Sequence, residues 1–207
     1  MSPSNTTHHL TYFAVPGRAE LIRLLFAYGN LPLEQTQFTL EEYTAAKPTL
    51  CLPYGQLPVI SVDGKIFAQS LAIARYTAKL VGLYPEDPLA ALEVDGIIDA
   101  IADLLLPIFN AIYSESDEAI RATKLQRINS TVLPRGLAFL EQQVHGHISV
   151  GTERTVADLS ILDFYDNVLN AFPGQITVDT TPYPKLTAIA EGLRKSDRLQ
   201  AYYAAKA

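Results

Sequence analysis

The order of apolar and polar positions divides the chain into two parts with different secondary structure. In the first part, alternating segments typical of strands (9–13, 34–38, 56–62 and 65–68) are separated by segments with helical spacing (18–28, 41–46 and 70–81). Asp63-Gly64 stands between the last two strand segments, and this pair favours the positive φ angles of a tight hairpin turn. The pattern therefore predicts the order β-α-β-α-β-β-α, ending near Leu83.

Beyond a proline-rich stretch at 84–88, which we predict to be a linker, the strand pattern disappears. Apolar residues recur at three-and-four spacing from Ile97 to Ile112, which predicts a long amphipathic helix with a kink at Pro107. Thr155 and Asp158 have the spacing of a capping box. Further helices are expected at 117–144, 156–172, 185–195 and 197–205. The sequence thus predicts an α/β domain over 1–83 and an all-helical domain over 89–207.

Charge and cysteine content narrow the classes of function. Lys and Arg number 16 against 22 Asp and Glu, and the resulting net charge of −6 argues against nucleic acid as a partner. Cys51 is the single cysteine, which fits a reducing compartment. No secretory leader pattern opens the sequence, and no apolar run approaches the length that spans a bilayer. We therefore expect a cytoplasmic protein without a membrane partner.

Polar residues gather where strands and helices of the first domain meet. Tyr12 ends the first predicted strand, Gln56 precedes the hairpin, and Gln69-Ser70 opens the third helix. A helix start is a natural anion site, because its N–H groups and its dipole favour negative charge. Each feature alone has a structural interpretation, since a tyrosine at a strand end is usually a core residue and Gln-Ser before a helix is usually a cap.

Together these segments resemble the tyrosine-type glutathione transferases. Leu10–Glu20, Tyr54–Val59 and Gln69–Tyr76 are similar to motifs of that family, and Thr155–Asp158 resembles its helix-capping motif. The resemblance spans nearly the whole chain, with some segments closer to the sigma class and others to the pi class, so the class stays open. It implies a thioredoxin-like α/β domain followed by an all-α domain. It also implies a detoxification enzyme that conjugates the thiolate of glutathione to hydrophobic electrophiles.

The resemblance also implies roles for individual residues. The Tyr12 hydroxyl would stabilise the glutathione thiolate, and a cis Pro58 would let the backbone of Leu57 pair with the cysteinyl part. Gln69 and Ser70 would hold the γ-glutamyl carboxylate. Asp103 would reach the γ-glutamyl amine bound to the partner subunit of a homodimer, or is a solvated helix position. Tyr54 would be an aromatic key in that dimer, or packs on its own domain. The full implied glutathione set is Tyr12, Arg18, Tyr43, Lys47, Gln56, Leu57, Pro58, Gln69, Ser70 and Asp103 of the partner subunit.

Three positions depart from the family pattern. Tyr43 stands where tryptophan is common, and the chain contains no tryptophan. Thr49 stands where a lysine is usual, so Lys47 either reaches the glycyl carboxylate by another path or is a plain surface lysine. Pro16 replaces a common arginine, which alters the turn after Tyr12.

The second substrate is expected to meet an apolar wall. The candidate residues are Phe13, Val15, Leu106, Phe109, Asn110 and Tyr113, and their alternative interpretation is ordinary core. We expect no metal and no cofactor other than glutathione as co-substrate. A dedicated glutathione-dependent isomerase or peroxidase, or a non-catalytic ligand-binding protein on the same fold, stays open as an alternative.

Overall fold

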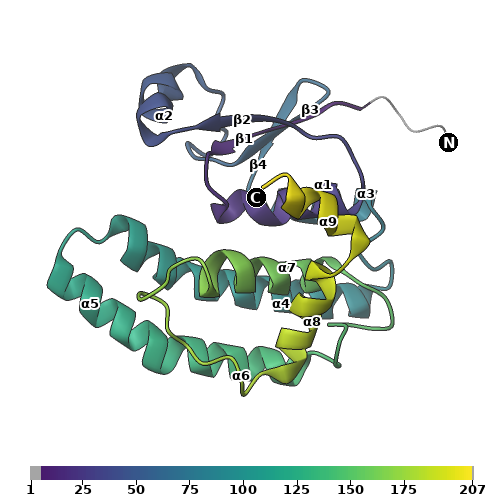
Figure 1. Ribbon diagram of the computed structural model, residues 1–207. Coiled ribbons are helices and arrows are strands. Elements are labelled where there is room, and N and C mark those ends of the chain that lie inside the picture. The colour runs from purple at the N-terminus through teal and green to yellow at the C-terminus, as the bar shows by residue number, and fades with distance from the viewer. Residues whose placement is uncertain (1–5, 207) are drawn as a thin grey trace. The chain divides into compact units, whose positions relative to one another are not determined.

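A computed structural model describes residues 6–206, which divide into two compact units (Figure 1). One unit contains the residues up to Val81 together with those from Asp197 on, and the other is Gly82–Ser196. Residues 1–5 and 207 lie outside the described part, and so does part of the segment in which a secretory leader pattern was sought.

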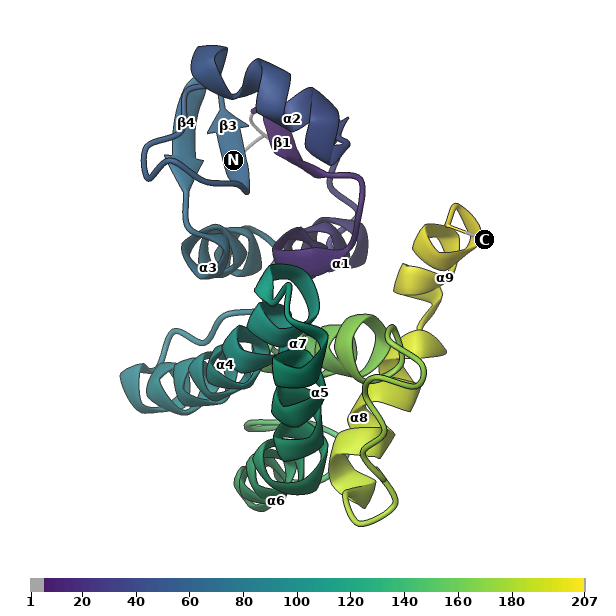
Figure 2. The ribbon, with the colours of Figure 1, turned by 90° about the vertical axis from the view of Figure 1, so that its left-hand side faces the viewer.

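The first unit is built on a four-stranded sheet of order β2-β1-β3-β4. The β1–β2 pair is parallel, and the other two pairs are antiparallel. Helices α1 and α3 lie side by side on one face of the sheet, and α2 lies on the other side (Figure 2). The element bounds are β1 (His8–Phe13), η1 (Gly17–Ala19), α1 (Glu20–Tyr28), β2 (Glu34–Phe38), α2 (Leu40–Ala46), η2 (Lys47–Thr49), β3 (Val59–Val62), β4 (Lys65–Ala68) and α3 (Ser70–Leu80). This is the predicted thioredoxin-like arrangement.

Two predicted boundaries of the first unit differ from the observed ones by two or more residues, for local reasons. The helix expected from Arg18 begins at Glu20, because Gly17–Ala19 forms a tighter 3-10 turn that Gly17 enters at φ +47°. The strand expected from Gln56 begins at Val59, since Pro58 has no N–H to donate to a ladder. Both differences fall next to predicted site residues.

The alternation read from the sequence explains how the sheet packs. His8, Leu10 and Tyr12 of β1 are buried, and the residues between them are half-buried. Helix α1 covers that face with Ile22 and Leu25, both fully buried. Burying one such side chain contributes about 1.5–3 kcal/mol, so this contact anchors β1 and the turn that follows it.

The second unit is a helical bundle in which α4 packs against α6 and α7, and α8 packs against α7. Its predicted long helices are interrupted by wider π turns. After Pro107, α4 continues to Phe109 and passes into η3, where the Asn110 N–H lies between the carbonyls of Leu106 and Pro107. The bounds are α4 (Pro88–Phe109), η3 (Asn110–Ser114), α5 (Glu118–Arg127), η4 (Ile128–Val132), α6 (Leu133–Gln143), α7 (Val156–Phe164), η5 (Tyr165–Leu169) and α8 (Pro184–Arg194).

The last helix, α9 (Asp197–Ala204), packs on α1 and therefore lies with the first unit. Leu199 is its fully buried residue. The division of the sequence into domains at 1–83 and 89–207 with a linker at 84–88 stays a prediction. By its contacts, α9 belongs structurally to the unit that begins the chain.

The start of α7 confirms the predicted capping box. Asp158 is fully buried, and its carboxylate accepts hydrogen bonds from the Thr155 N–H at 2.8 Å and the Ser149 hydroxyl at 2.7 Å. Arg154 lies 2.9 Å away and supplies a positive charge. This carboxylate therefore joins the loop before α7 to the helix itself.

Replacing Asp158 by alanine should destabilise the second unit strongly. The change leaves several buried donors and one arginine unpaired, so urea unfolding should show a loss of about 3–5 kcal/mol. Asp87→Ala is the matched control, because Asp87 caps α4 at an exposed position and its loss should cost about 1 kcal/mol. Equal losses for the two variants would contradict the structural role assigned to Asp158.

Candidate functional site

The sheet register brings the ends of several strands to one edge. Thr11 of β1 pairs with Val59 of β3, and Val59 pairs with Ala68 of β4. Strand β2 runs parallel to β1, so α2 starts from the same edge. Tyr12 follows Thr11 in β1, Gln69 follows Ala68 at the end of β4, and Pro58 precedes Val59 at the start of β3. All three therefore lie at this edge. The three segments singled out in the sequence therefore meet in the first unit.

The turn after β1 closes around the Tyr12 hydroxyl. Tyr12 is 8% exposed, and its hydroxyl oxygen accepts a hydrogen bond from the Arg18 N–H at 3.0 Å. A Cβ on Gly17 would lie 2.7 Å from that oxygen, so only glycine fits there. A phenol oxygen that accepts one hydrogen bond still carries its own hydrogen. The turn thus fixes the position from which Tyr12 can donate to an anion.

Gln69 has an unusual backbone conformation at the start of α3. Its φ of +75° and ψ of 106° lie outside the regions that residues with a Cβ ordinarily occupy. Ser70 is the first residue of the 11-residue helix α3, whose N-terminal amides favour an anion. Strained residues persist where the surroundings require them, often at ligand sites. The carboxylate-binding role expected of Gln69-Ser70 stays a prediction, and the strain next to a helix start agrees with it.

The segment before β3 has the expected cis peptide bond between Leu57 and Pro58. The ladder of β3 begins only at Val59, so Leu57 lies outside the hydrogen-bonded sheet. The Leu57 side chain is buried and Gln56 is exposed. An extended ligand could therefore reach the Leu57 backbone at the edge that carries Tyr12.

Aromatic contacts connect the Tyr12 region to α2. The Phe13 ring lies 5.4 Å from the Tyr12 ring and 4.9 Å from the Tyr43 ring. Lys47 is exposed, with its ammonium 5.6 Å from the centre of the Tyr43 ring. The structure thus brings Tyr43 and Lys47 to the same side of the first unit as Phe13. The Arg18 side chain is exposed, while its backbone N–H binds Tyr12.

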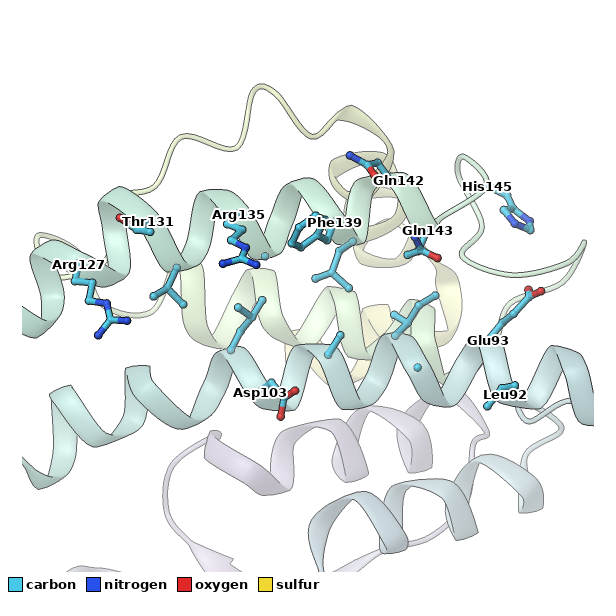
Figure 3. A pocket seen from close by; sticks show the side chains of 17 residues that line it. Leu92, Glu93, Asp103, Arg127, Thr131, Arg135, Phe139, Gln142, Gln143 and His145 are labelled. Carbon is cyan, nitrogen blue, oxygen red and sulfur yellow. The ribbon is translucent and has the colours of Figure 1, made fainter.

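Asp103 lies in the second unit, exposed on α4. It lines a cavity of about 960 Å³ (Figure 3). Helix α4 forms one wall of this cavity, and the end of α5, the π turn η4 and α6 form the other. Leu92 and Glu93 come from α4 as well, and Arg127, Arg135 and Phe139 come from the opposite wall. The cavity is lined by both charged and apolar side chains.

The predicted electrophile residues fall in both units. In the first unit Phe13 is half-buried and Val15 is exposed, and in the second Leu106 is exposed and Phe109 is half-buried. Asn110 accepts a hydrogen bond from the Lys124 ammonium at 3.0 Å. Their joint role at one site stays a prediction.

Tyr113 forms an aromatic group that sequence reasoning recognised only in part. Its ring lies 5.7 Å from Phe109 and 6.0 Å from Phe172. Partial burial raises the pKa of the Tyr113 phenol above its ordinary value. The π turn η3 places Tyr113 beside Phe109 and Phe172. Helical spacing in the sequence did not indicate that Phe172 belongs to this group.

Sequence reasoning missed two buried charged residues beside Tyr12. Glu20 and Arg23 of α1 are 1% and 6% exposed and lie 3.2 Å apart. Arg23 donates to the carbonyl of Val15 in the turn after β1 at 3.0 Å. The available signal was a pair of opposite charges three residues apart on the apolar face of a predicted helix.

No helix within 6–206 has both the length and the apolar character needed to cross a bilayer. In the same residues, no three His, Cys, Asp or Glu side chains gather in a way that could hold a metal ion. The expectation that no metal takes part stays an expectation.

Comparison with known proteins agrees with the fold described above. The family model described as "Glutathione S-transferase, N-terminal domain" matches residues 8–79, and "Glutathione S-transferase, C-terminal domain" matches residues 102–206. Glutathione S-transferase S1 of Drosophila melanogaster is 36% identical over 203 residues, covering 97% of this chain and 79% of the relative. A glutathione S-transferase of Anopheles gambiae is 38% identical over 173 residues, covering 78% and 83%.

Solved structures give the same result for the fold. The structure titled prostaglandin synthase D of Nilaparvata lugens superposes with a TM-score of 0.86 at 26% sequence identity. The match covers 96% of this chain and 97% of that one.

The backbone strain at Gln69 predicts an inverted order of stability for two substitutions. Gln69→Gly should be more stable than Gln69→Ala by about 1 kcal/mol, because glycine adopts positive φ without a Cβ clash. In an unstrained helix start the difference would be small or reversed. Both variants remove the side-chain amide of Gln69, so each is a matched control for the other. Urea unfolding measures the difference in their free energies of unfolding. An alanine variant as stable as the glycine variant would contradict the strain.

Proposed function

The chain belongs to the glutathione S-transferase family, and from that premise we propose that Tyr12 activates the thiol of glutathione in the first unit. The protein is an enzyme, a glutathione transferase. Relatives with 36% and 38% identity over most of the chain carry that name, which supports conjugation. The names of these relatives do not favour the alternatives of a dedicated isomerase, a peroxidase or a non-catalytic ligand-binding protein.

The observation that carries the proposal is the fixed hydroxyl of Tyr12. A free thiol titrates near 8.5, so lowering its pKa by about two units requires roughly 2.7 kcal/mol of preference for the thiolate. A hydrogen bond to a charged group supplies about 1.5–3 kcal/mol. One protonated tyrosine therefore nearly suffices without a general base. With its oxygen bound by the Arg18 amide, Tyr12 would donate its hydrogen to the sulfur, as an oxyanion donor does.

The rest of the edge would hold glutathione in place. Ser70 and the first amides of α3 would bind the γ-glutamyl carboxylate, with Gln69 and Gln56 alongside. The Leu57 backbone would pair with the cysteinyl part. Lys47, with Tyr43 beside it, would meet the glycyl carboxylate, and the exposed Arg18 side chain would add positive charge. What supports this assignment is the register that brings Tyr12, Pro58 and Gln69 to one edge.

The electrophile belongs to a class that the apolar candidate residues can bind. Phe13, Val15, Leu106, Phe109 and Tyr113 offer mostly apolar surface, and Asn110 adds a polar group. We infer small hydrophobic electrophiles and a role in their detoxification. A cytoplasmic location remains our proposal from the single cysteine and the composition.

We also propose that the enzyme works as a homodimer. Tyr54 is 65% exposed, so its ring is available to pack against a second subunit. The cavity beside Asp103 carries two further exposed apolar residues, Leu92 at 68% and Phe139 at 54%. In a symmetric dimer, Tyr54 of one subunit would enter this cavity of the other, and Asp103 would approach the glutathione of the partner subunit.

Tyr12→Phe should separate thiol activation from binding. The change removes only the hydroxyl, so the KM for glutathione should stay within about twofold. Near pH 6.5, kcat with a chlorodinitrobenzene should fall by roughly tenfold to a hundredfold, because less thiolate is present. Above about pH 9 the thiol ionises without help, so the two rates should converge. Tyr28→Phe, which alters a half-buried tyrosine at the far end of α1, is the control. Full activity of Tyr12→Phe near neutral pH would contradict the assignment.

Tyr54→Ala should weaken the dimer. Loss of an aromatic anchor buried at an interface raises the dissociation constant by roughly thirtyfold or more. Sedimentation equilibrium measures this shift. Leu40→Ala is the control, because Leu40 is 73% exposed on α2 and has no place in the proposed interface. A wild type that is monomeric and fully active would contradict the shared-site dimer, and a dimer unaffected by Tyr54→Ala would contradict the key.

A further inference from the structure

A buried charge network in the first unit lies between the turn of Tyr12 and the C-terminal helix. Its centre is Glu20, which begins α1 and is 1% exposed. Arg23, 6% exposed, lies 3.2 Å from Glu20 Oε2. Buried ions lose their hydration and need several hydrogen-bonding partners to be tolerated. Here those partners come from two different directions.

On one side, Arg23 binds the backbone of the loop that follows Tyr12. Its Nη1 donates to the carbonyls of Val15 at 3.0 Å and Pro16 at 3.3 Å, and its Nη2 reaches the carbonyl of Phe13 at 3.4 Å. The guanidinium is a rigid planar fork, so contacts to three successive parts of a loop fix its course. This loop leads directly into the 3-10 turn that closes on the Tyr12 hydroxyl.

The Arg23 guanidinium is itself fixed at several points. Its Nε donates to Gln35 Oε1 at 2.8 Å, which ties it to β2. Its carbon lies 5.9 Å from the centre of the Tyr12 ring, within range of a cation–π attraction. Glu20 supplies the compensating charge. A shift of the Glu20 carboxylate would therefore shift the Arg23 guanidinium, which holds the loop.

On the other side, Glu20 is held by the C-terminal segment. The Tyr202 hydroxyl donates to Glu20 Oε1 at 2.5 Å, and the Lys206 ammonium forms an ion pair with the same oxygen. Helix α9 has a second, separate anchor, since Arg198 donates to the carbonyl of Tyr28 at 3.2 Å. Of these two polar anchors, the one at Glu20 leads to Arg23.

We propose that α9 is a positioning element of the thiol-activating site, acting through Glu20 and Arg23 on the loop that presents Tyr12. Tyr202 and Lys206 hold the Glu20 carboxylate, Glu20 orients the guanidinium, and the guanidinium holds the loop carbonyls. The inference rests on the proposed role of Tyr12. A hydrogen bond to a thiolate depends on a placement accurate to about half an ångström, so residues distant from the sulfur can set its strength. None of these four side chains was in the set predicted from the sequence.

A network that only stabilised the fold would behave differently. Weakening it would lower the melting temperature and leave the acidity of bound glutathione unchanged. A positioning network changes the hydrogen bond from Tyr12 to sulfur, and so raises the apparent pKa seen in the pH dependence of kcat. The KM for glutathione should change little, because the carboxylate contacts at α3 are untouched.

Tyr202→Phe is the most conservative test, since it removes one hydroxyl from a half-buried residue. Near pH 6.5, kcat should fall roughly threefold to tenfold, with the KM for glutathione within twofold and recovery to the wild-type rate above about pH 9. Arg23→Lys keeps the charge but loses the fork, and should shift the same profile further. Circular dichroism melts of both variants confirm that the fold is intact at the assay temperature.

Arg198→Ala is the matched control, because it removes the other anchor of the same helix. It should leave the pH profile of kcat at its wild-type position. Equal shifts in Arg198→Ala and Tyr202→Phe would overturn the route through Glu20. An unshifted profile in both Tyr202→Phe and Arg23→Lys would overturn the positioning role.

Tyr12→Phe in the same assay distinguishes failure of this inference from failure of the proposed function. If Tyr12→Phe shifts the profile and the network variants do not, only this inference fails. An unshifted profile in Tyr12→Phe overturns the proposed function, and with it this inference.

Discussion

The hydrogen bond from the Arg18 amide to the Tyr12 hydroxyl is the contact on which the site depends. The Arg18 nitrogen lies 3.0 Å from the phenol oxygen, and in the proposed mechanism the phenol would donate its hydrogen to the thiolate. The turn is possible because Gly17 adopts φ +47° and has no Cβ to meet the ring. Helix α1 fastens the turn to the sheet through its buried apolar face. Catalysis in this account is therefore electrostatic stabilisation by one preorganised donor.

The remainder of the first unit follows from the sheet register. Antiparallel pairing of β3 with β1 and with β4 brings Pro58 and Gln69 to the edge where Tyr12 ends β1. Residues separated by more than 50 positions in sequence thus meet at one edge of the sheet. The strained backbone of Gln69 and the glycine turn at Gly17 lie at this same edge. In the proposed function, the bound tripeptide would lie beside these two positive-φ residues.

Much of the fold could be predicted from the sequence because local patterns determined it. The Asp63-Gly64 hairpin, the strand at 34–38 and the cap at Thr155–Asp158 each depend on residues close together in the chain. Three features were not predicted from these patterns, and two of them depend on contacts far apart in sequence. The π turns divide the long helices, α9 returns to pack on α1, and Glu20 is paired with Tyr202 and Lys206. Hydrophobic periodicity describes the face of a helix but does not identify its partner.

The central claim is that Tyr12 lowers the pKa of the glutathione thiol by donating one hydrogen bond. The most direct test is a spectroscopic titration of the thiolate absorbance of glutathione bound to the wild-type protein, with Gly17→Ala and Gly64→Ala compared. Both glycines have positive φ, but only a Cβ at Gly17 would meet the Tyr12 hydroxyl. The account predicts a bound thiol pKa about two units below that of the free thiol in wild type and Gly64→Ala, and a value near that of the free thiol in Gly17→Ala. A wild-type protein whose bound thiol titrates like free glutathione would contradict it.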